Sequence, residues 1–256
     1  MRRALTGWRP LLVLALLIGA WELYVDLGGA DPLVLPAPHA VARALYDDRG
    51  LLWSNFLTTA EEVLLGIALA SAAALALAVL IHFSPTLSRA LYPLLVGSQA
   101  IPIPIISSVL VLWLGFGLLP KLMVIALVCF FPIVVTALAG LAAVDEDLIK
   151  LMRTFDASRL RTFRHVELPS ALPGLLTGAK IAVAVAVIGA VFAELAGSSS
   201  GLGYLYQQSQ GQLLMPRAYA IVTILCLFAI ALFALLTLAE RLAVPWAYRP
   251  RGEVPA

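Results

Sequence analysis

Charged residues are scarce in this chain of 256 residues, at 12% of the sequence, whereas hydrophobic residues make up 62%. Soluble domains typically carry about 25% charged and roughly 45–50% apolar residues, so the composition predicts an integral membrane protein. Apolar runs recur along nearly the whole sequence and leave no stretch for a separate soluble domain, which needs about 50 residues or more. The net charge of +2 is small, and no nucleic-acid partner is expected.

Groups that could hold a metal or form disulfides are also few. The only two cysteines, Cys129 and Cys226, lie inside apolar runs, so neither a disulfide framework nor a cysteine metal site is supported. The three histidines, His39, His82 and His165, are scattered without ligand spacing. We interpret each of them as a boundary or loop residue, and we expect no metal and no cofactor.

Two stretches resemble catalytic or phosphate-binding motifs but lack other residues that those motifs require. Gly197–Gly201 formally fits the Gly-x-Ser-x-Gly nucleophile elbow, but that fold needs an acid and then a histidine later in the chain. After Ser199 the sequence contains neither Asp nor His. The stretch from Gly174 to Lys180 lacks the spacing and the final hydroxyl of a phosphate-binding loop. The chain is therefore predicted not to be an enzyme, and no catalytic residue is assigned.

Apolar runs of about 20 residues, enough to cross a bilayer as a helix, occur about six times. Lipid admits only helices or closed barrels, and these runs are continuous rather than alternating, which favours an all-α, polytopic transmembrane helical bundle. The expected spans are Leu11–Leu27, Thr58–Phe83, Leu87–Leu114, Leu118–Leu141, Leu172–Leu195 and Ala218–Leu242.

The distribution of Lys and Arg predicts the orientation, because these residues concentrate on the cytoplasmic side. With the N-terminus inside, most of the 17 Lys and Arg are cytoplasmic. The exceptions are Arg43, Arg49, Lys121 and Arg217. This division favours cytoplasmic N- and C-termini and an even number of spans in a bacterial inner membrane.

The first span has a second interpretation. Its basic start, short apolar run and the small residues Gly28, Gly29 and Ala30 also fit a secretory signal peptide. The apolar stretch continues through Val25, beyond the usual length of such a segment, which favours a retained helix. The following connection, 31–55, contains an amphipathic piece, Ala40–Tyr46, that we expect to lie on the outer membrane surface.

The third span contains Pro102 and Pro104, each of which removes a helical hydrogen bond. Such breaks persist at membrane depth where they line a water-filled cavity or are buried in protein, so both a translocation path and a kinked packing helix remain open. Glu194, near the outer end of the fifth span, is either functional or hydrogen-bonded to the Ser198–Ser200 loop. The candidate path residues are Gln99, Pro102, Pro104, Ser107 and Glu194.

Two further interpretations concern small and acidic residues in the spans. Gly174 and Gly178 form a small-xxx-small pair that permits close helix approach, which we interpret as packing. Glu61 and Glu62 are expected to be solvated at the outer start of the second span.

The stretch from Asp145 to Pro173 is the one long charged segment between two hydrophobic ones. Asp145 can cap a helix with one apolar face, Asp156-Ala-Ser158 can form a turn, and a second short helix is expected to stop at Leu168-Pro169. The apolar face consists of Leu148, Leu151, Met152 and Phe155. From the residues alone, an interfacial pair of helices on anionic lipid and a docking surface for a soluble partner both remain open.

This segment resembles the cytoplasmic loop of the membrane subunits of binding-protein-dependent ABC importers. That pattern is Glu-Ala-Ala, three residues, Gly, nine residues, Ile, any residue and Leu-Pro. Here Leu168-Pro169 and the spacing match, with Val166 for Ile, whereas Asp156 stands for Gly and Lys150-Leu151-Met152 for Glu-Ala-Ala. The departures keep a turn-forming residue and the aliphatic face.

Further motifs occur in the order expected for the nitrate/sulfonate/taurine group of these permeases. Within that group the chain reads most like the branch assigned to the pyrimidine precursor of thiamine. The similarity covers roughly residues 58–246. The motifs are Leu112-Trp-Leu-Gly-Phe-Gly117, Cys129-Phe-Phe-Pro132, Thr154-Phe-Asp-Ala-Ser158, Leu168-Pro-Ser-Ala-Leu-Pro-Gly174 and Ala193-Glu-Leu-Ala-Gly-Ser-Ser-Ser-Gly-Leu-Gly-Tyr204.

The resemblance implies the type I importer permease fold, with an N-terminal helix and external connection (1–57), a permease domain (58–246) that includes a coupling loop (145–170), and a cytoplasmic tail (247–256). It implies two separate ATPase subunits, a second copy of the permease and an extracytoplasmic binding protein as partners in the bilayer. The implied ATPase-coupling residues are Lys150, Leu151, Met152, Phe155, Asp156, Ala157, Ser158, Val166, Leu168 and Pro169.

The implied function is a translocation path for a small polar solute, either a thiamine pyrimidine precursor or a sulfonate- or nitrate-like anion. An ATP-independent secondary transporter or channel is the alternative class. Such proteins tend to show paired broken helices in repeated halves and buried coupling charges. In this sequence only the third span is visibly broken, and Glu194 is the main buried charge.

Overall fold

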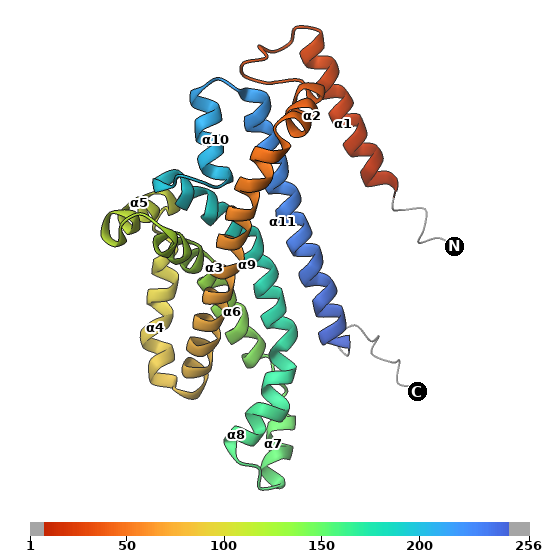
Figure 1. Cartoon of the computed structure of the whole chain (residues 1–256). Coiled ribbons are helices and arrows are strands. Elements are labelled where there is room, and N and C mark those ends of the chain that lie inside the picture. Colours follow the sequence, from red (N-terminus) through yellow and green to blue (C-terminus); the bar gives the residue numbers. More distant parts are fainter. Residues whose placement is uncertain (1–7, 246–256) are drawn as a thin grey trace. The chain divides into compact units, whose positions relative to one another are not determined.

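A computed structural model describes residues 8–245 (Figure 1). Within these residues every regular element is helical, which confirms the all-α expectation. The α-helices are α1 (Trp8–Asp26), α2 (Pro38–Asp47), α3 (Arg49–Phe83), α4 (Pro85–Ser98), α5 (Ile103–Leu114), α6 (Leu118–Ala142), α7 (Glu146–Thr154), α8 (Arg159–Thr162), α9 (Leu168–Gly197), α10 (Leu202–Gly211) and α11 (Met215–Ala243). The expected tail, 247–256, and the basic residues Arg2 and Arg3 lie outside the described residues.

The chain divides into two compact units. The first unit contains the residues up to Thr59 together with 199–226, and the second contains 60–198 together with the residues from Leu227. The helices α3 and α11 each contribute a part to both units.

Among the described residues, four helical stretches are long and apolar enough to cross a membrane, or five if the bent pair α4 and α5 is one span. The four are α3, α6, α11 and the uninterrupted stretch Arg159–Gly197. About six spans were expected. The expected first span corresponds to α1, which is not among these stretches.

The expected third span is two helices, α4 and α5, bent by 101° at a short break. Pro102 occupies the N-cap of α5 and Pro104 lies in its first turn. Backbone N–H groups at these positions make no hydrogen bond within the helix, so proline costs none there. The two prolines therefore start a new helix instead of interrupting one.

The expectation that Leu168-Pro169 ends the second loop helix is wrong. The helix α8 continues through a π-helical turn, Phe163–Glu167, directly into α9. In this turn the Leu168 N–H donates to the carbonyl of Phe163, five residues earlier, a local widening that helices accommodate without ending. Pro169 then falls in the first turn of α9, a position that tolerates proline.

Small residues hold α6 and α9 together in the second unit. A Cβ atom added at Gly178 would come within 1.9 Å of the Thr136 hydroxyl, and one at Gly174 within 3.2 Å of the Cα atom of Gly140. Contact this close is available only to residues without side chains, as in small-xxx-small packing. These distances support the packing interpretation of Gly174 and Gly178.

The first unit has its own apolar core and includes α10, which the sequence did not predict. The N-terminus of α10 is capped by side chains of α3, because the Gly201 N–H donates to Asn55 at 2.8 Å and the Leu202 N–H to Thr59 at 2.8 Å. Such bonds satisfy donors that a helix start leaves open. The buried core residues are Val41, Leu52, Leu202, Leu205, Ala220 and Ile221.

Replacing Gly140 with alanine is expected to destabilise the protein. The new Cβ would lie 2.9 Å from the backbone carbonyl oxygen of Ala171, which no side-chain rotation can relieve, so we expect a loss of about 1–3 kcal/mol, as for other overpacked sites. Thermal unfolding in detergent measures this change. Gly97→Ala is the matched control, because no atom lies within 4 Å of its added Cβ; equal loss in both variants would contradict the packing interpretation.

Candidate functional site

The helix α7 begins and ends as its sequence predicts. The Asp145 side chain accepts a hydrogen bond from the Asp147 N–H at 2.9 Å, acidic residues occupy the first turn and Arg153 lies in the last. Each of these charges complements the helix dipole. The capped, amphipathic helix expected after Asp145 is confirmed.

The apolar face of α7 is not covered by the described part of the chain. None of the residues of α7 is buried, and the side chain of Phe155, directly after the helix, is 72% exposed. Leu151 is 51% exposed, and Leu160 on the following helix is 70% exposed. In Figure 1 the helices α7 and α8 form a hairpin beyond one end of α9, and the apolar side chains on this hairpin are exposed.

The turn of this hairpin is set by Asp156, which has a φ of 52°. The Asp156 N–H donates to the carbonyl of Arg153 at 3.0 Å and the Ala157 N–H to that of Met152 at 3.1 Å. This pair of bonds is the Schellman motif, in which the left-handed residue is usually glycine. Aspartate visits that conformation more readily than most residues, so Asp156 performs the part that the importer pattern gives to glycine.

The other expected coupling residues fall into two groups. Lys150, which pairs with Asp147 at 2.9 Å, and Ser158, which caps α8 by accepting from the Arg161 N–H at 3.4 Å, lie with Asp156 in the exposed hairpin. Val166 is half-buried in the π-helical turn, and Leu168 and Pro169 begin α9. The second group therefore belongs to the stem that supports the hairpin.

The stem is attached to the end of α3 by a contact that the sequence did not reveal. His82 Nε2 lies 2.7 Å from Glu167 Oε2. Beside this pair the rings of Phe83 and Phe163 have centroids 5.1 Å apart, and the Arg159 guanidinium lies 4.8 Å from the Phe83 ring centroid. Because His82 and Glu167 are 85 residues apart, no local pattern could have paired them.

Ionisable residues inside the second unit are paired across helices. Lys121 Nζ on α6 lies 2.6 Å from Glu62 Oε1 on α3, and Lys180 Nζ on α9 lies 2.7 Å from Glu240 Oε2 on α11. Glu62 is 2% exposed, so the expectation that it is solvated is wrong. The sequence did contain an indication of this pairing, because these charged residues lie in or beside apolar runs, where an unpaired charge is energetically expensive.

The expected path residues do not form one cluster. Gln99, Pro102 and Pro104 lie at or next to the break between α4 and α5, and each is exposed. Ser107, one turn further, is buried and donates to the Pro104 carbonyl at 2.9 Å. Glu194 is 1% exposed and belongs with Glu62 instead.

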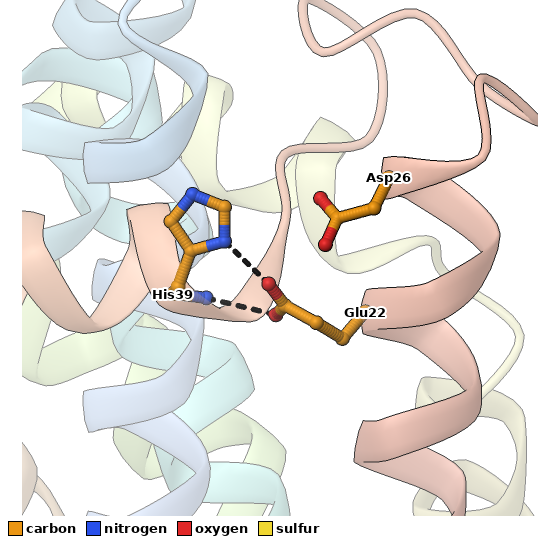
Figure 2. Close-up of side chains that lie close together, drawn as sticks. All are labelled: Glu22, Asp26 and His39. Atoms are coloured by element: carbon orange, nitrogen blue, oxygen red, sulfur yellow. Dashed lines mark hydrogen bonds and ion pairs between the residues drawn. The ribbon is translucent and has the colours of Figure 1, made fainter.

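Figure 2 shows the one group of described residues with the geometry to hold a metal ion, Glu22, Asp26 and His39. Their ligand atoms lie within 4.8 Å of one another. His39 already donates its backbone N–H to Glu22 at 3.1 Å, and its ring Nδ1 pairs with the same carboxylate. All three residues are at least partly exposed, and this solvated ion pair connects α1 to α2 without requiring a metal.

The first unit contains two cavities, of about 490 Å³ and 430 Å³. Tyr206, Gln210 and Tyr219 line the larger one, and Arg217, which forms a bidentate pair with Asp48, lines the smaller. Neither cavity is lined by any of the expected path residues.

The sequence is similar to several named permeases over most of its length. It is 37% identical over 225 residues to a probable ABC transporter permease protein of Haemophilus influenzae, covering 88% of this chain and 92% of the relative. It is 34% identical to the formylaminopyrimidine transport permease protein ThiX of Halalkalibacterium halodurans (96% and 98% covered). It is 35% identical to the riboflavin transport system permease protein RibX of Chloroflexus aurantiacus (92% and 88% covered).

A solved structure shares the fold. A chain of the inward-facing MetNI methionine ABC transporter superposes with a TM-score of 0.66, covering 78% of this chain and 98% of that one, at 20% sequence identity. At this identity the likeness concerns the fold alone.

The family comparison decides between the transporter classes that the sequence left open. The profile described as binding-protein-dependent transport system inner membrane component matches residues 63–247, which is more than half of the chain. This match sets aside the ATP-independent alternative, and the family is normally non-catalytic. The chain belongs to this family, and it is the membrane-spanning permease subunit of a binding-protein-dependent ABC importer.

Proposed function

We propose that the α7–α8 hairpin is the surface to which the ATPase subunit of the importer binds, and that the permease carries a small, planar nitrogen heterocycle. The observation that carries the first part is the apolar face of Leu151, Phe155 and Leu160, which is exposed on an otherwise well-formed, capped hairpin. Exposed apolar groups gathered at one place and bordered by charges are typical of protein interaction sites.

The length of the uninterrupted helix supports this assignment. The stretch Arg159–Gly197 contains 39 residues, which corresponds to about 58 Å of helix. A bilayer with its headgroup regions is about 40–45 Å thick. The hairpin at the end of this stretch therefore extends beyond the membrane, where a soluble subunit can reach it and lipid cannot cover it.

The orientation follows from the basic residues of the hairpin. Lys150, Arg153, Arg159, Arg161 and Arg164 are all exposed, and positive charge in a short loop favours the cytoplasmic side. The N- and C-termini then lie on the same side as the hairpin, and the external connection 31–55 faces the binding protein.

Two copies of the permease with two ATPase subunits form the proposed assembly. One chain supplies a single hairpin, and exposed apolar side chains at and just after the C-terminal end of α5 offer a surface that a second copy can cover. These include Leu112, Trp113 and Phe116, which are 82%, 76% and 83% exposed. A homodimer gives each ATPase its own hairpin and encloses one path between the copies.

Coupling then requires the ATPases to bind two conformations of the permease with different affinities. A partner with equal affinity for both would not change the equilibrium between them. Closure of the ATPases on ATP displaces the two hairpins. Since α8 continues through the π-helical turn into α9 as one helical stretch, the displacement is transmitted to the spans and changes which side of the path is open.

Two observations support a neutral heterocycle over a sulfonate-like anion. Relatives that are 34% and 35% identical carry the names of formylaminopyrimidine and riboflavin permeases. Within the described part of the second unit, the two lysines inside the spans, Lys121 and Lys180, are each neutralised by a glutamate. Neither lysine is then free to compensate the charge of an anion crossing the membrane.

Substitution of Phe155 and Leu151 by serine is expected to abolish binding of the ATPase while the permease still inserts and folds. Both side chains are exposed, so their loss removes interface contacts and no core contact; interface anchors of this kind are worth about 2 kcal/mol or more each. Co-purification of the ATPase measures binding. Leu33→Ser is the control, because Leu33 is 53% exposed and lies in the connection after α1, outside both the hairpin and the proposed dimer surface. Retained co-purification with the hairpin variant would exclude the hairpin as the docking site.

The turn residue allows a second test. Asp156→Gly is expected to keep coupling, since glycine adopts a φ of 52° freely. Asp156→Val is expected to lose it, because a β-branched residue is strongly disfavoured there. Transport and ATP hydrolysis are measured in vesicles with the binding protein present. If the valine variant transports as well as the glycine variant, the hairpin geometry is not required for coupling.

The substrate proposal is tested by uptake into vesicles that contain the complete importer. We expect labelled formylaminopyrimidine to accumulate only with ATP and the binding protein, and taurine not to accumulate. The reverse result would replace the heterocycle by an anion and leave the docking proposal intact. Binding of the same two compounds to the isolated binding protein is the control, because it shows whether the binding protein rather than the permease selects between them.

A further inference from the structure

Three ionisable side chains lie together in the core of the second unit. Glu62 on α3 is 2% exposed, Lys121 on α6 is 6% exposed and Glu194 on α9 is 1% exposed. Lys121 Nζ lies 2.6 Å from Glu62 Oε1, and the side chain of Glu194 interacts with that of Glu62. Each residue comes from a different membrane-spanning helix, so the group connects three spans.

The charges of these three groups do not balance if both carboxyls are ionised. One ammonium neutralises one carboxylate, and the second would leave a net negative charge where desolvation is costly. The neighbouring ionisable group on α3, Glu61, is also acidic and is exposed. The helix α5, which packs on α6 and α9, carries no ionisable residue between Ile103 and Leu114.

The other lysine of α9 offers no compensation. Lys180 pairs with Glu240, and it lies about 21 Å along the helix from Glu194. The described residues of the second unit therefore place one cation, Lys121, against two buried carboxyls.

One buried carboxylate oxygen that lacks a hydrogen-bond donor indicates how this excess charge is neutralised. Glu62 Oε2 is buried, and no hydrogen bond of normal geometry reaches it from the described residues. An ionised carboxylate accepts hydrogen bonds and cannot donate them, whereas a protonated carboxylic acid carries one O–H donor. A proton on Glu194 removes the excess charge and supplies a donor for this oxygen.

We propose that Glu62, Lys121 and Glu194 form a buried proton-binding site, in which Glu194 is a neutral carboxylic acid at neutral pH and donates to the ionised Glu62. The bound proton makes the group electrically neutral and links α3, α6 and α9. Water would solvate a second carboxylate, so the proton is held only while these three helices exclude water, and its release accompanies any opening of this core.

Infrared spectroscopy of the full-length chain in lipid nanodiscs at neutral pH tests the site directly. A buried protonated carboxylic acid has a C=O stretching band that ionised carboxylates lack. We expect this band in the unmodified protein, its loss in Glu194→Gln and its retention in Glu61→Gln, the exposed neighbour. Glutamine keeps a donor toward Glu62, so Glu194→Gln is expected to elute as a folded protein.

A second variant keeps the proposal testable if Glu194→Gln fails to fold. Lys121→Met removes the only cation of the group, so Glu62 should also become protonated and the carboxylic acid band should grow. Absence of the band in the unmodified protein, its persistence in Glu194→Gln, or an unchanged band in Lys121→Met would each overturn the proposal. None of these variants touches the α7–α8 hairpin, so the result is independent of the proposed docking site.

Discussion

The interior of an apolar helix bundle accepts a charged group only when that group is neutralised, and this constraint organises the second unit. Lys121 and Glu62 meet at 2.6 Å, and Lys180 and Glu240 at 2.7 Å. Removing one partner from such a pair would leave a buried charge uncompensated, which typically costs about 3–5 kcal/mol. The pairs therefore specify which helices lie together, whereas apolar contacts alone allow many registers.

A second constraint, close packing on glycine, holds α6 against α9. Gly140, Gly174 and Gly178 bring α6 and α9 so near that added Cβ atoms would overlap the neighbouring helix or lie closer than usual contacts. In a membrane, where no hydrophobic effect drives helices together, such packing is a main source of association. Packing thus sets the separation of α6 and α9, whereas the ion pairs attach α3 to α6 and α11 to α9.

Local features of the fold were predictable because their causes lie within a few residues. The cap at Asp145, the turn at Asp156 and the amphipathic face of α7 follow from side-chain chemistry and spacing. Contacts between distant residues were not predictable, since Glu62 and Lys121 are 59 residues apart and His82 and Glu167 are 85 apart. The expectation that a helix ends at Leu168-Pro169 also failed, because a π-helical turn directly before Leu168 allows the helix to continue past Pro169.

The helices α3 and α9 are joined at two places along their length. His82 on α3 is held to Glu167 at the start of α9, and Glu62 on α3 interacts with Glu194 near the end of α9. Along α3 these two contacts are separated by about 30 Å of helix, which is close to the thickness of the hydrocarbon core. Both contacts lie on the single helical stretch Arg159–Gly197. If the ATPase binds the hairpin as proposed, a displacement there reaches the His82–Glu167 contact first, and the continuous helix provides the connection from that contact to the buried carboxyls.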